Sequence, residues 1–250
     1  MFRVLLVATL SADKKMPHYR KGDRLIHYVA IPKTYTSSVE KLLQNEGWVK
    51  DMEIFNELAR LTRNVVDTRH AHADAYNQLS LYNKLNNIKI DYEFATVRHP
   101  VERIKSTIYF LVSQWNKGMT KIPREHMPIE DITPQVIIKF IYDIFTLAIP
   151  KEGLHTEYNV FLPQHRFVNP DTVIFKCEKL TSLLNELKEQ DIISKNAAFP
   201  HKNRSTPKNF KKVNPDWYHS PSVSNYFFKF YKKDFELFNY DYFYDNSIKS

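Results

Sequence analysis

Apolar and polar positions near the start of the chain predict a strand, a tight loop and a helix in succession. Apolar residues crowd positions 25–31, as a parallel strand that is covered on both faces requires. Pro32 ends this strand, and polar residues dominate the loop over 32–36. Ser37, with Glu40 three residues later, fits the capping box that opens many helices.

Strand-like and helix-like segments alternate through the rest of the chain, which predicts an α/β fold with a parallel sheet. Further strands are predicted over 64–68, 91–98 and 172–175. Helices are predicted over 37–47, 51–63, 75–85, 100–115, 134–148, 180–188 and 220–238. Loops are predicted over 11–23, 117–134 and 201–212. The aromatic stripe of the last helix is typical of core packing rather than of a surface that stacks bases.

Length and charge narrow the class of protein without choosing its partner. The chain has 250 residues, of which 43% are hydrophobic, and no linker or repeat divides it, so a single domain over residues 1–250 is expected. Lys and Arg outnumber Asp and Glu by 36 to 28. The net charge of +8 favours anionic partners such as nucleotides, nucleic acid, acidic sugars or membrane surfaces.

The single cysteine and the N-terminal residues bear on the compartment. Cys177 has no second cysteine to pair with, so an internal disulfide is excluded and a reducing, cytoplasmic location is expected. The apolar run over residues 4–10 is too short to span a bilayer. We expect an edge strand or an ordered segment there, with the remnant of a signal peptide as the alternative.

The loop over residues 32–36 has the composition of an anion site. Lys33 and the hydroxyl residues after it stand where a helix begins, and backbone N–H groups at a helix N-terminus, hydroxyls and a lysine together bind phosphate. The loop is not a Walker A motif, because the chain has 4 glycines and none lies in this loop. A chance lysine and serine in an ordinary strand–turn–helix unit remain the alternative.

A second strand–helix corner offers another candidate for anion binding. Arg98 ends the predicted strand over 91–98, Pro100 opens the next helix, and Ser106 lies two turns into that helix. Arginine as a bidentate cation and serine as a hydroxyl donor could therefore reach one phosphate. The alternative is a solvated arginine beside an unrelated helix serine.

Two histidines follow the predicted strand over 64–68. His70 and His72 have no third partner with metal-ligand spacing, so a metal site is not expected. Because ligands of α/β folds bind at the carboxyl ends of strands, both histidines would lie near the Lys33 loop. A neutral imidazole is a good general base for a hydroxyl, whereas a structural or surface role is the alternative.

Taken in order, these motifs resemble the sulfotransferases that use 3′-phosphoadenosine 5′-phosphosulfate (PAPS). The segment 31–38, IPKTYTSS, resembles the 5′-phosphosulfate loop of that superfamily, and 94–106, FATVRHPVERIKS, resembles its 3′-phosphate motif. The segment 234–240, DFELFNY, resembles its usual chain ending. The resemblance covers residues 25–240 and implies a P-loop-NTPase-like three-layer sandwich, in which helices flank a central parallel sheet.

A narrower resemblance points to carbohydrate sulfotransferases of the uronyl 2-O type. His70-Ala71-His72 is similar to their His-x-His pair, and the segment 201–206, HKNRST, resembles their basic loop over the cofactor. Transfer to a hydroxyl, with a glycan as the acceptor, is therefore implied. Neither nucleic acid nor a membrane is an expected partner.

The resemblance also implies roles for particular residues. Lys33 would offset charge on the departing phosphate, His72 would act as general base, and His70 would orient it. The cofactor residues implied are Lys33, Thr34, Tyr35, Thr36, Ser37, Ser38, Arg98, Ser106, Lys202, Arg204 and Ser205. The residues expected to contact an acidic acceptor are Arg69, Arg124, His165 and Arg166. No metal is expected, because lysine and backbone donors supply the positive charge.

Two positions depart from the family pattern. Tyr35 stands where members have a small residue, and His99 replaces an acidic or amide residue. Unlike Golgi members, this chain is expected to have neither a membrane anchor nor disulfides. Two other classes stay open: a kinase with a degenerate phosphate loop, and a non-catalytic basic module that binds polyanions such as nucleic acid or acidic polysaccharide.

Overall fold

The computed structural model describes residues 18–51, 87–115, 134–143, 159–200 and 221–241. The strand expected over 64–68, the helices expected over 51–63 and 75–85, and the loops expected over 117–134 and 201–212 lie outside this part of the chain. The N-terminal run over residues 4–10 lies outside it too.

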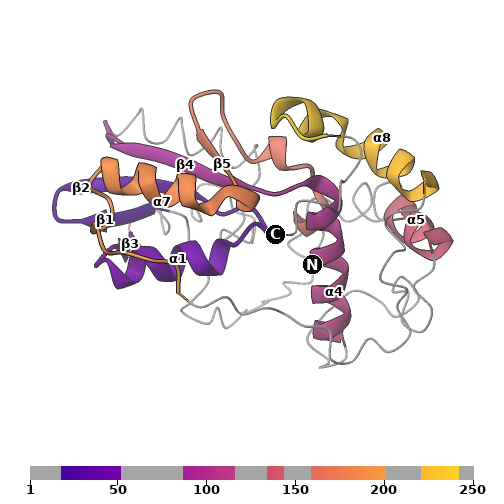
Figure 1. Cartoon of the computed structure of the whole chain (residues 1–250), viewed down its shortest axis with the longest axis horizontal. Helices are drawn as coiled ribbons and strands as arrows, with labels where there is room; N and C mark the ends of the chain where they lie inside the picture. Colours follow the sequence, from indigo (N-terminus) through magenta and orange to yellow (C-terminus); the bar gives the residue numbers. More distant parts are fainter. Residues whose placement is uncertain (1–17, 52–86, 116–133, 144–158, 201–220, 242–250) are drawn as a thin grey trace, which may run out of the picture.

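The described strands form one five-stranded sheet in the order β3-β1-β2-β4-β5 (Figure 1). The strands are β1 His18–Lys21, β2 Arg24–Val29, β3 Val49–Lys50, β4 Tyr92–Val97 and β5 Val173–Lys176. β2, β4 and β5 pair in parallel, whereas β1 is antiparallel to both β2 and β3. The α/β fold with a parallel core that the sequence predicts is therefore confirmed, and it carries an antiparallel extension on one side.

The antiparallel extension corrects the prediction of a loop over residues 11–23. Residues 18–21 form β1, which turns into β2 through Gly22 and Asp23. Gly22 has a φ of +58°, a conformation that glycine adopts without Cβ strain and that hairpin turns require. The polar sequence of β1 concealed the strand, because only its first two residues are buried.

The described helices agree with the expected ones within a few residues. Their bounds are α1 Thr36–Asn45, α4 Pro100–Trp115, α5 Pro134–Asp143, α7 Leu180–Glu189 and α8 Pro221–Leu237. Short 3₁₀ turns are η4 Asn159–Phe161, η5 Gln164–Arg166 and η6 Cys177–Lys179. None of the described helices combines the length and apolar character needed to cross a membrane.

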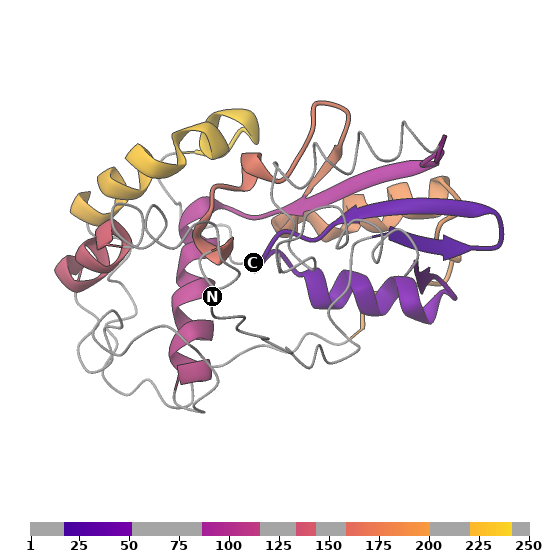
Figure 2. The same ribbon diagram turned by 180° about the vertical axis from the view of Figure 1, so that it is seen from behind.

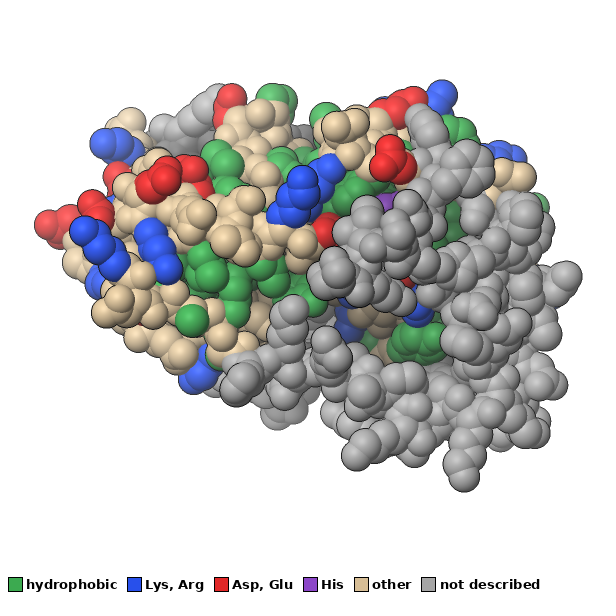
Figure 3. Space-filling view, viewed as in Figure 1, with side chains coloured by type: hydrophobic (Ala, Val, Ile, Leu, Met, Phe, Trp, Pro, Cys, Tyr) green, Lys and Arg blue, Asp and Glu red, His purple; other side chains and the backbone are tan. Residues whose placement is uncertain are grey.

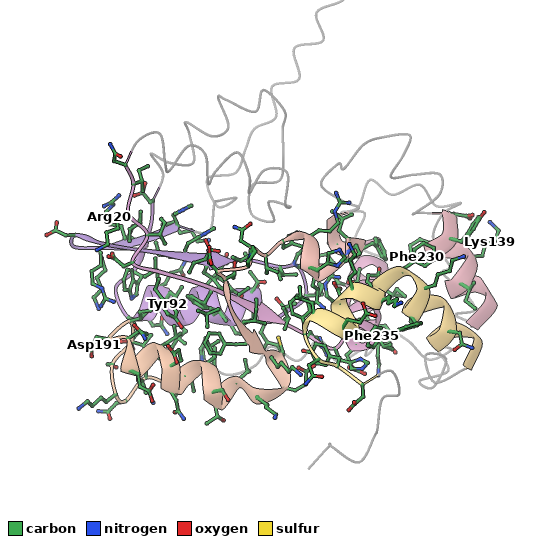
Figure 4. All side chains as sticks on the ribbon, turned by 90° about the horizontal axis from the view of Figure 1, so that it is seen from above. Arg20, Tyr92, Lys139, Asp191, Phe230 and Phe235 are labelled. Carbon is green, nitrogen blue, oxygen red and sulfur yellow. The ribbon has the colours of Figure 1, made fainter. Side chains whose placement is uncertain are left out.

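Two apolar clusters pack on opposite faces of the sheet. On one face, α1 and α7 cover Tyr28 and Phe94 with Leu42, Leu43, Leu183 and Leu187. Tyr92 reaches across the same layer to bond Glu186 of α7 (Figure 4). On the other face, Val29, Ala95 and Val97 pack against Leu162, Phe167 and Phe238. In both views α4, α5 and α8 gather at the end of the sheet where β4 runs into α4 (Figures 1 and 2).

The aromatic stripe of α8 belongs to the core, as its spacing predicts. Phe227, Tyr231 and Phe235 are buried, and the Tyr231 hydroxyl donates to the carbonyl of Phe161 at 2.7 Å. Tyr231 also departs from helical backbone angles, at φ −111° and ψ 15°, so the helix bends at this anchored residue. The stripe therefore fixes α8 against η4 and leaves these rings no surface for a base.

Candidate functional site

The candidate site lies at the carboxyl ends of two neighbouring parallel strands. β2 leads through the loop 30–35 into α1, and β4 leads through Arg98 and His99 into α4 (Figure 1). Because β2 and β4 are adjacent and parallel, the two helices begin at the same edge of the sheet. This edge is where α/β folds bind ligands, and the first turn of each helix favours an anion there.

The loop after β2 is held in an unusual backbone conformation. Lys33 and Tyr35 have φ values of 68° and 63°, in the left-handed region that side chains other than glycine rarely adopt. Tyr35 is the N-cap of α1, and only glycine would adopt this backbone conformation without strain. A conformation of this kind persists only where its surroundings hold it.

The predicted capping box is wrong. Among the described residues no side chain caps α1, because Tyr35 is its N-cap and Ser37 lies inside the first turn with its side chain exposed. Glu40 pairs with Lys50 of β3 at 3.3 Å instead. The N-cap is Tyr35 rather than Ser37, so Ser37 and Glu40 do not occupy the two positions that a capping box requires.

Buried hydroxyls fix the loop from beneath. The hydroxyls of Thr34 and Thr36 both donate to the carbonyl of Ile31, at 2.8 and 2.7 Å. Thr96 of β4 donates to the carbonyl of Thr34 at 2.6 Å, and the Tyr28 hydroxyl lies 2.8 Å from the Thr96 hydroxyl. Burial raises the pKa of Tyr28, which keeps this phenol a donor. The two loop threonines thus shape the loop, and their hydroxyl hydrogens point inward.

Lys33 lies along α4. Its Nζ stands 4.1 Å from the centre of the Phe110 ring, a distance typical of a cation–π contact. Phe110 is 39% exposed, although it is a large apolar side chain in the middle of a helix. The contact brings the ammonium group of the loop against the helix that starts at the neighbouring strand end.

Arg98 and Ser106 form the second predicted pair; Arg98 lies just before α4 and Ser106 lies within it. Nη2 of Arg98 is 3.2 Å from Oε2 of Glu102, whose other oxygen lies 3.5 Å from Nζ of Lys105. One carboxylate therefore orients two cations on the first turns of the helix. Ser106 follows two turns into α4 with its side chain partly exposed.

Arg103 joins the two strand–helix corners, and sequence reasoning missed it. Its fully buried guanidinium donates to the carbonyls of Pro32, Leu162 and Val160, at 2.9, 2.8 and 2.9 Å. Burial lowers the pKa of Arg103 from its usual value. The available signal was an arginine next to Ile104 on an otherwise apolar helix face.

A second missed group consists of Gln164 and Asp234. The side-chain amide of Gln164 accepts from the backbone N–H of Arg98 at 2.8 Å and donates to the backbone carbonyl of Arg98 at 2.7 Å. Asp234 of α8, fully buried, accepts from the backbone N–H groups of Gln164 and His165. Asp234 lies in the chain-ending motif, which was the only sequence signal for it.

His165, which was expected to contact the acceptor, is paired with a buried carboxylate of the fold. Its Nδ1 lies 2.8 Å from Oδ1 of Asp234, so this ring is fixed from below by a buried carboxylate. Arg166, the next expected acceptor residue, follows in the same 3₁₀ turn with its side chain partly exposed. Both residues follow Gln164 in this turn, and the side chain of Gln164 bonds the backbone of Arg98.

His99 packs as part of the core. Its backbone N–H donates to Glu178, and its ring stands edge-on to Phe235 and Tyr240 at 5.4 and 5.3 Å. Burial lowers the pKa of His99, so the ring is neutral at pH 7. Aromatic packing therefore accounts for a histidine at this position.

Several expected site residues lie outside the described part of the chain. They are Arg69, His70, His72, Arg124, Lys202, Arg204 and Ser205. Within the described residues, no group of three or more His, Cys, Asp or Glu side chains is arranged to hold a metal ion. Of the expected site residues that are described, Lys33 and Tyr35 lie in the loop before α1, Ser37 lies in the first turn of α1, Arg98 lies just before α4, and Ser106 lies two turns into α4.

Comparison with known proteins gives the family. The model of the sulfotransferase family matches residues 18–241, a span that includes both strand–helix corners and the chain ending. Neither a curated protein nor a solved structure matches the chain. The family match covers far more than half of the chain, so this protein belongs to the sulfotransferase family.

Proposed function

We propose that this protein transfers a sulfuryl group from PAPS to a hydroxyl of a carbohydrate acceptor. The observation that supports the proposal most is the pair of joined corners, each with a cation at a helix start. Arg103 of α4 bonds the carbonyl of Pro32, and Thr96 of β4 bonds the carbonyl of Thr34, so Lys33 and Arg98 belong to one rigid edge. PAPS carries an anionic group at each end of its ribose, which suits two such corners.

The loop after β2 is assigned to the 5′-phosphosulfate. Ser37 and Ser38 lie in the first turn of α1, while Thr34 and Thr36 hold the loop from inside. Lys33 offsets negative charge that grows on the departing phosphate oxygen as the sulfur–oxygen bond breaks. Tyr35 contributes its backbone and adds a ring beside the nucleotide.

The start of α4 is assigned to the 3′-phosphate. Arg98 supplies a guanidinium that Glu102 already orients, and Ser106 supplies a hydroxyl. Lys202, Arg204 and Ser205 are proposed to close over the nucleotide, as the family resemblance implies. Product PAP, which keeps the 3′-phosphate, is then bound by the same groups.

The acceptor side of the proposal rests on the resemblance. His72 takes the proton of the attacking hydroxyl, and His70 orients His72 or the sugar. The oxygen attacks sulfur in line with the departing 5′-phosphate, so one sulfur–oxygen bond forms as the other breaks. Arg69, Arg124 and Arg166 are proposed to contact an acidic acceptor, with His165 beside them.

Calorimetric titration of PAP tests the assignment. We expect the wild type to bind PAP more tightly than adenosine 5′-phosphate or ATP, and Arg98→Ala to lose about tenfold or more of its PAP affinity, the value of one charge-assisted phosphate contact. Adenosine 5′-phosphate affinity should stay within about threefold, because it lacks the group that Arg98 binds.

Arg20→Ala is the matched control. Arg20 also pairs with a carboxylate, Asp51, but it lies on β1 away from the two corners, so its loss should leave PAP affinity unchanged. A folded wild type that does not bind PAP would overturn the enzyme assignment and favour a module that binds polyanions. In Figure 3, acidic and basic side chains are interspersed over the described part of the face shown.

A further inference from the structure

The backbone of Arg98 lies just beyond the end of the sheet, and a side chain rather than a neighbouring strand holds it in place. The ladder between β4 and β5 ends at the pair Val97 and Lys176, and the chain after β5 turns into η6. At the next residue the Gln164 amide accepts from the Arg98 N–H and donates to the Arg98 carbonyl. One side chain thus makes the two hydrogen bonds that a neighbouring strand would make.

The Gln164 amide has its own support. Gln164 is fully buried, and its backbone N–H donates to Asp234 at 2.7 Å. The same carboxylate accepts from the backbone N–H and from Nδ1 of His165, both at 2.8 Å. Asp234 is itself fully buried on α8, so three donors satisfy it and fix the turn that carries Gln164.

We propose that Gln164, held by Asp234, is a positioning residue that aims Arg98 at the 3′-phosphate. The proposal rests on the function proposed above. The Gln164 amide fixes the main chain from which the Arg98 side chain starts, and Glu102 holds the guanidinium at its other end. A bidentate arginine contact requires both ends in place, because a displacement of about 1 Å weakens such a site strongly.

A structural role alone makes a different prediction. If Gln164 only stabilised the fold, its loss would lower the unfolding temperature and reduce the binding affinity for all nucleotides by a similar factor. If it positions Arg98, its loss removes the preference for a 3′-phosphate and leaves the rest of the nucleotide bound. The ratio of the affinities for PAP and for adenosine 5′-phosphate therefore separates the two roles.

The experiment measures this ratio by calorimetry in the wild type, Gln164→Met, Arg98→Ala and the double variant. Methionine keeps the length of glutamine but makes neither hydrogen bond. We expect Gln164→Met to lower the ratio by about tenfold, and to have no further effect once Arg98 is alanine, since coupled residues are not additive. Gln190→Met, the same change at an exposed glutamine of the α7 terminus, should leave the ratio unchanged.

Each remaining result decides between the proposals. If the ratio of the two affinities is unchanged in Gln164→Met, because neither affinity falls or because both fall by the same factor, the positioning role is overturned. The proposed function is then left intact. A wild type that does not prefer PAP overturns the 3′-phosphate assignment and the positioning role with it. If Gln164→Met does not fold, Gln164→Glu takes its place, because it keeps an oxygen for the Arg98 N–H and loses the donor to the Arg98 carbonyl.

Discussion

Thr96 is a single residue on which the shape of the phosphate loop depends. It is fully buried in β4, and its hydroxyl connects the Tyr28 phenol to the carbonyl of Thr34. Thr34 and Thr36 donate in turn to Ile31, so the hydroxyls form a network with a fixed direction. The network holds the left-handed residues Lys33 and Tyr35 in a conformation that they would otherwise leave.

Thr96→Val should destabilise the protein by about 1–3 kcal/mol, because it leaves a buried carbonyl and a buried phenol without this partner. Urea unfolding measures the loss. Thr107→Val is the control, since Thr107 is equally buried but, among the described residues, its hydroxyl bonds only the carbonyl of Arg103, four residues earlier in its own helix. An equal loss in both variants would contradict the role given to the network.

At the scale of elements, α4 is the helix that joins the site to the rest of the fold. Glu102 in its first turn pairs with Arg98 just before the helix, and Phe110 further along the helix contacts Lys33. Arg103 lies between these contacts and bonds both the loop after β2 and the segment around η4. Movement of α4 would therefore change both halves of the anion site together.

Arg103→Met should lower the free energy of unfolding by about 3 kcal/mol, because three buried carbonyls each lose a charged donor. Denaturant unfolding of the variant and the wild type measures this. Arg24→Met is the matched control: Arg24 also donates to two carbonyls, those of Asp191 and Gln190, but at the surface, where a loss below about 1 kcal/mol is expected. Similar losses of unfolding free energy at both positions would contradict the stabilising role given to the buried Arg103.

For the whole molecule, a row of polar side chains crosses the sheet away from the site. His18 and His27 stack with ring centres 4.3 Å apart, and Nδ1 of His27 lies 2.8 Å from Oε2 of Glu93. Burial lowers the pKa of His18 well below its usual value, and the neighbouring His27 and Arg20 act in the same direction. Burial alone would raise the pKa of Glu93, but hydrogen bonds from His27 and Thr172 outweigh it and lower that pKa.

These shifts predict a loss of stability in mild acid. Below about pH 6.5 the unfolded chain protonates His18 while the folded chain does not, so the free energy of unfolding should fall by up to about 1.4 kcal/mol per pH unit from this group. His18→Phe keeps a stacked ring without the titration, and unfolding curves between pH 8 and pH 5 should show a shallower slope. The buried His99 contributes with the same sign, so some slope should remain. An identical slope in the variant would contradict the role of His18.

Most elements of the fold could be predicted from the sequence alone. The strands over 25–31 and 91–98 and the helices after them have apolar patterns that local physics ties to one secondary structure. Lys33 and Arg98 could be chosen because each follows such a strand, and parallel strands end at a common edge. The polar strand β1 escaped prediction, since pairing with β2 rather than its own pattern makes it a strand.

The parts of the site that sequence reasoning missed depend on contacts between distant residues. Gln164 lies 66 positions from Arg98, and Asp234 lies 70 positions from Gln164, so no local pattern links them. Arg103 likewise joins separate segments only in the folded protein, where packing excludes water and leaves three backbone carbonyls as its partners. The sequence by itself therefore determined the elements and the two cations at their ends, because periodicity and helix starts are local. Only the tertiary structure decided which buried polar groups hold those cations in place, because burial forces each such group to find a partner wherever the fold brings one.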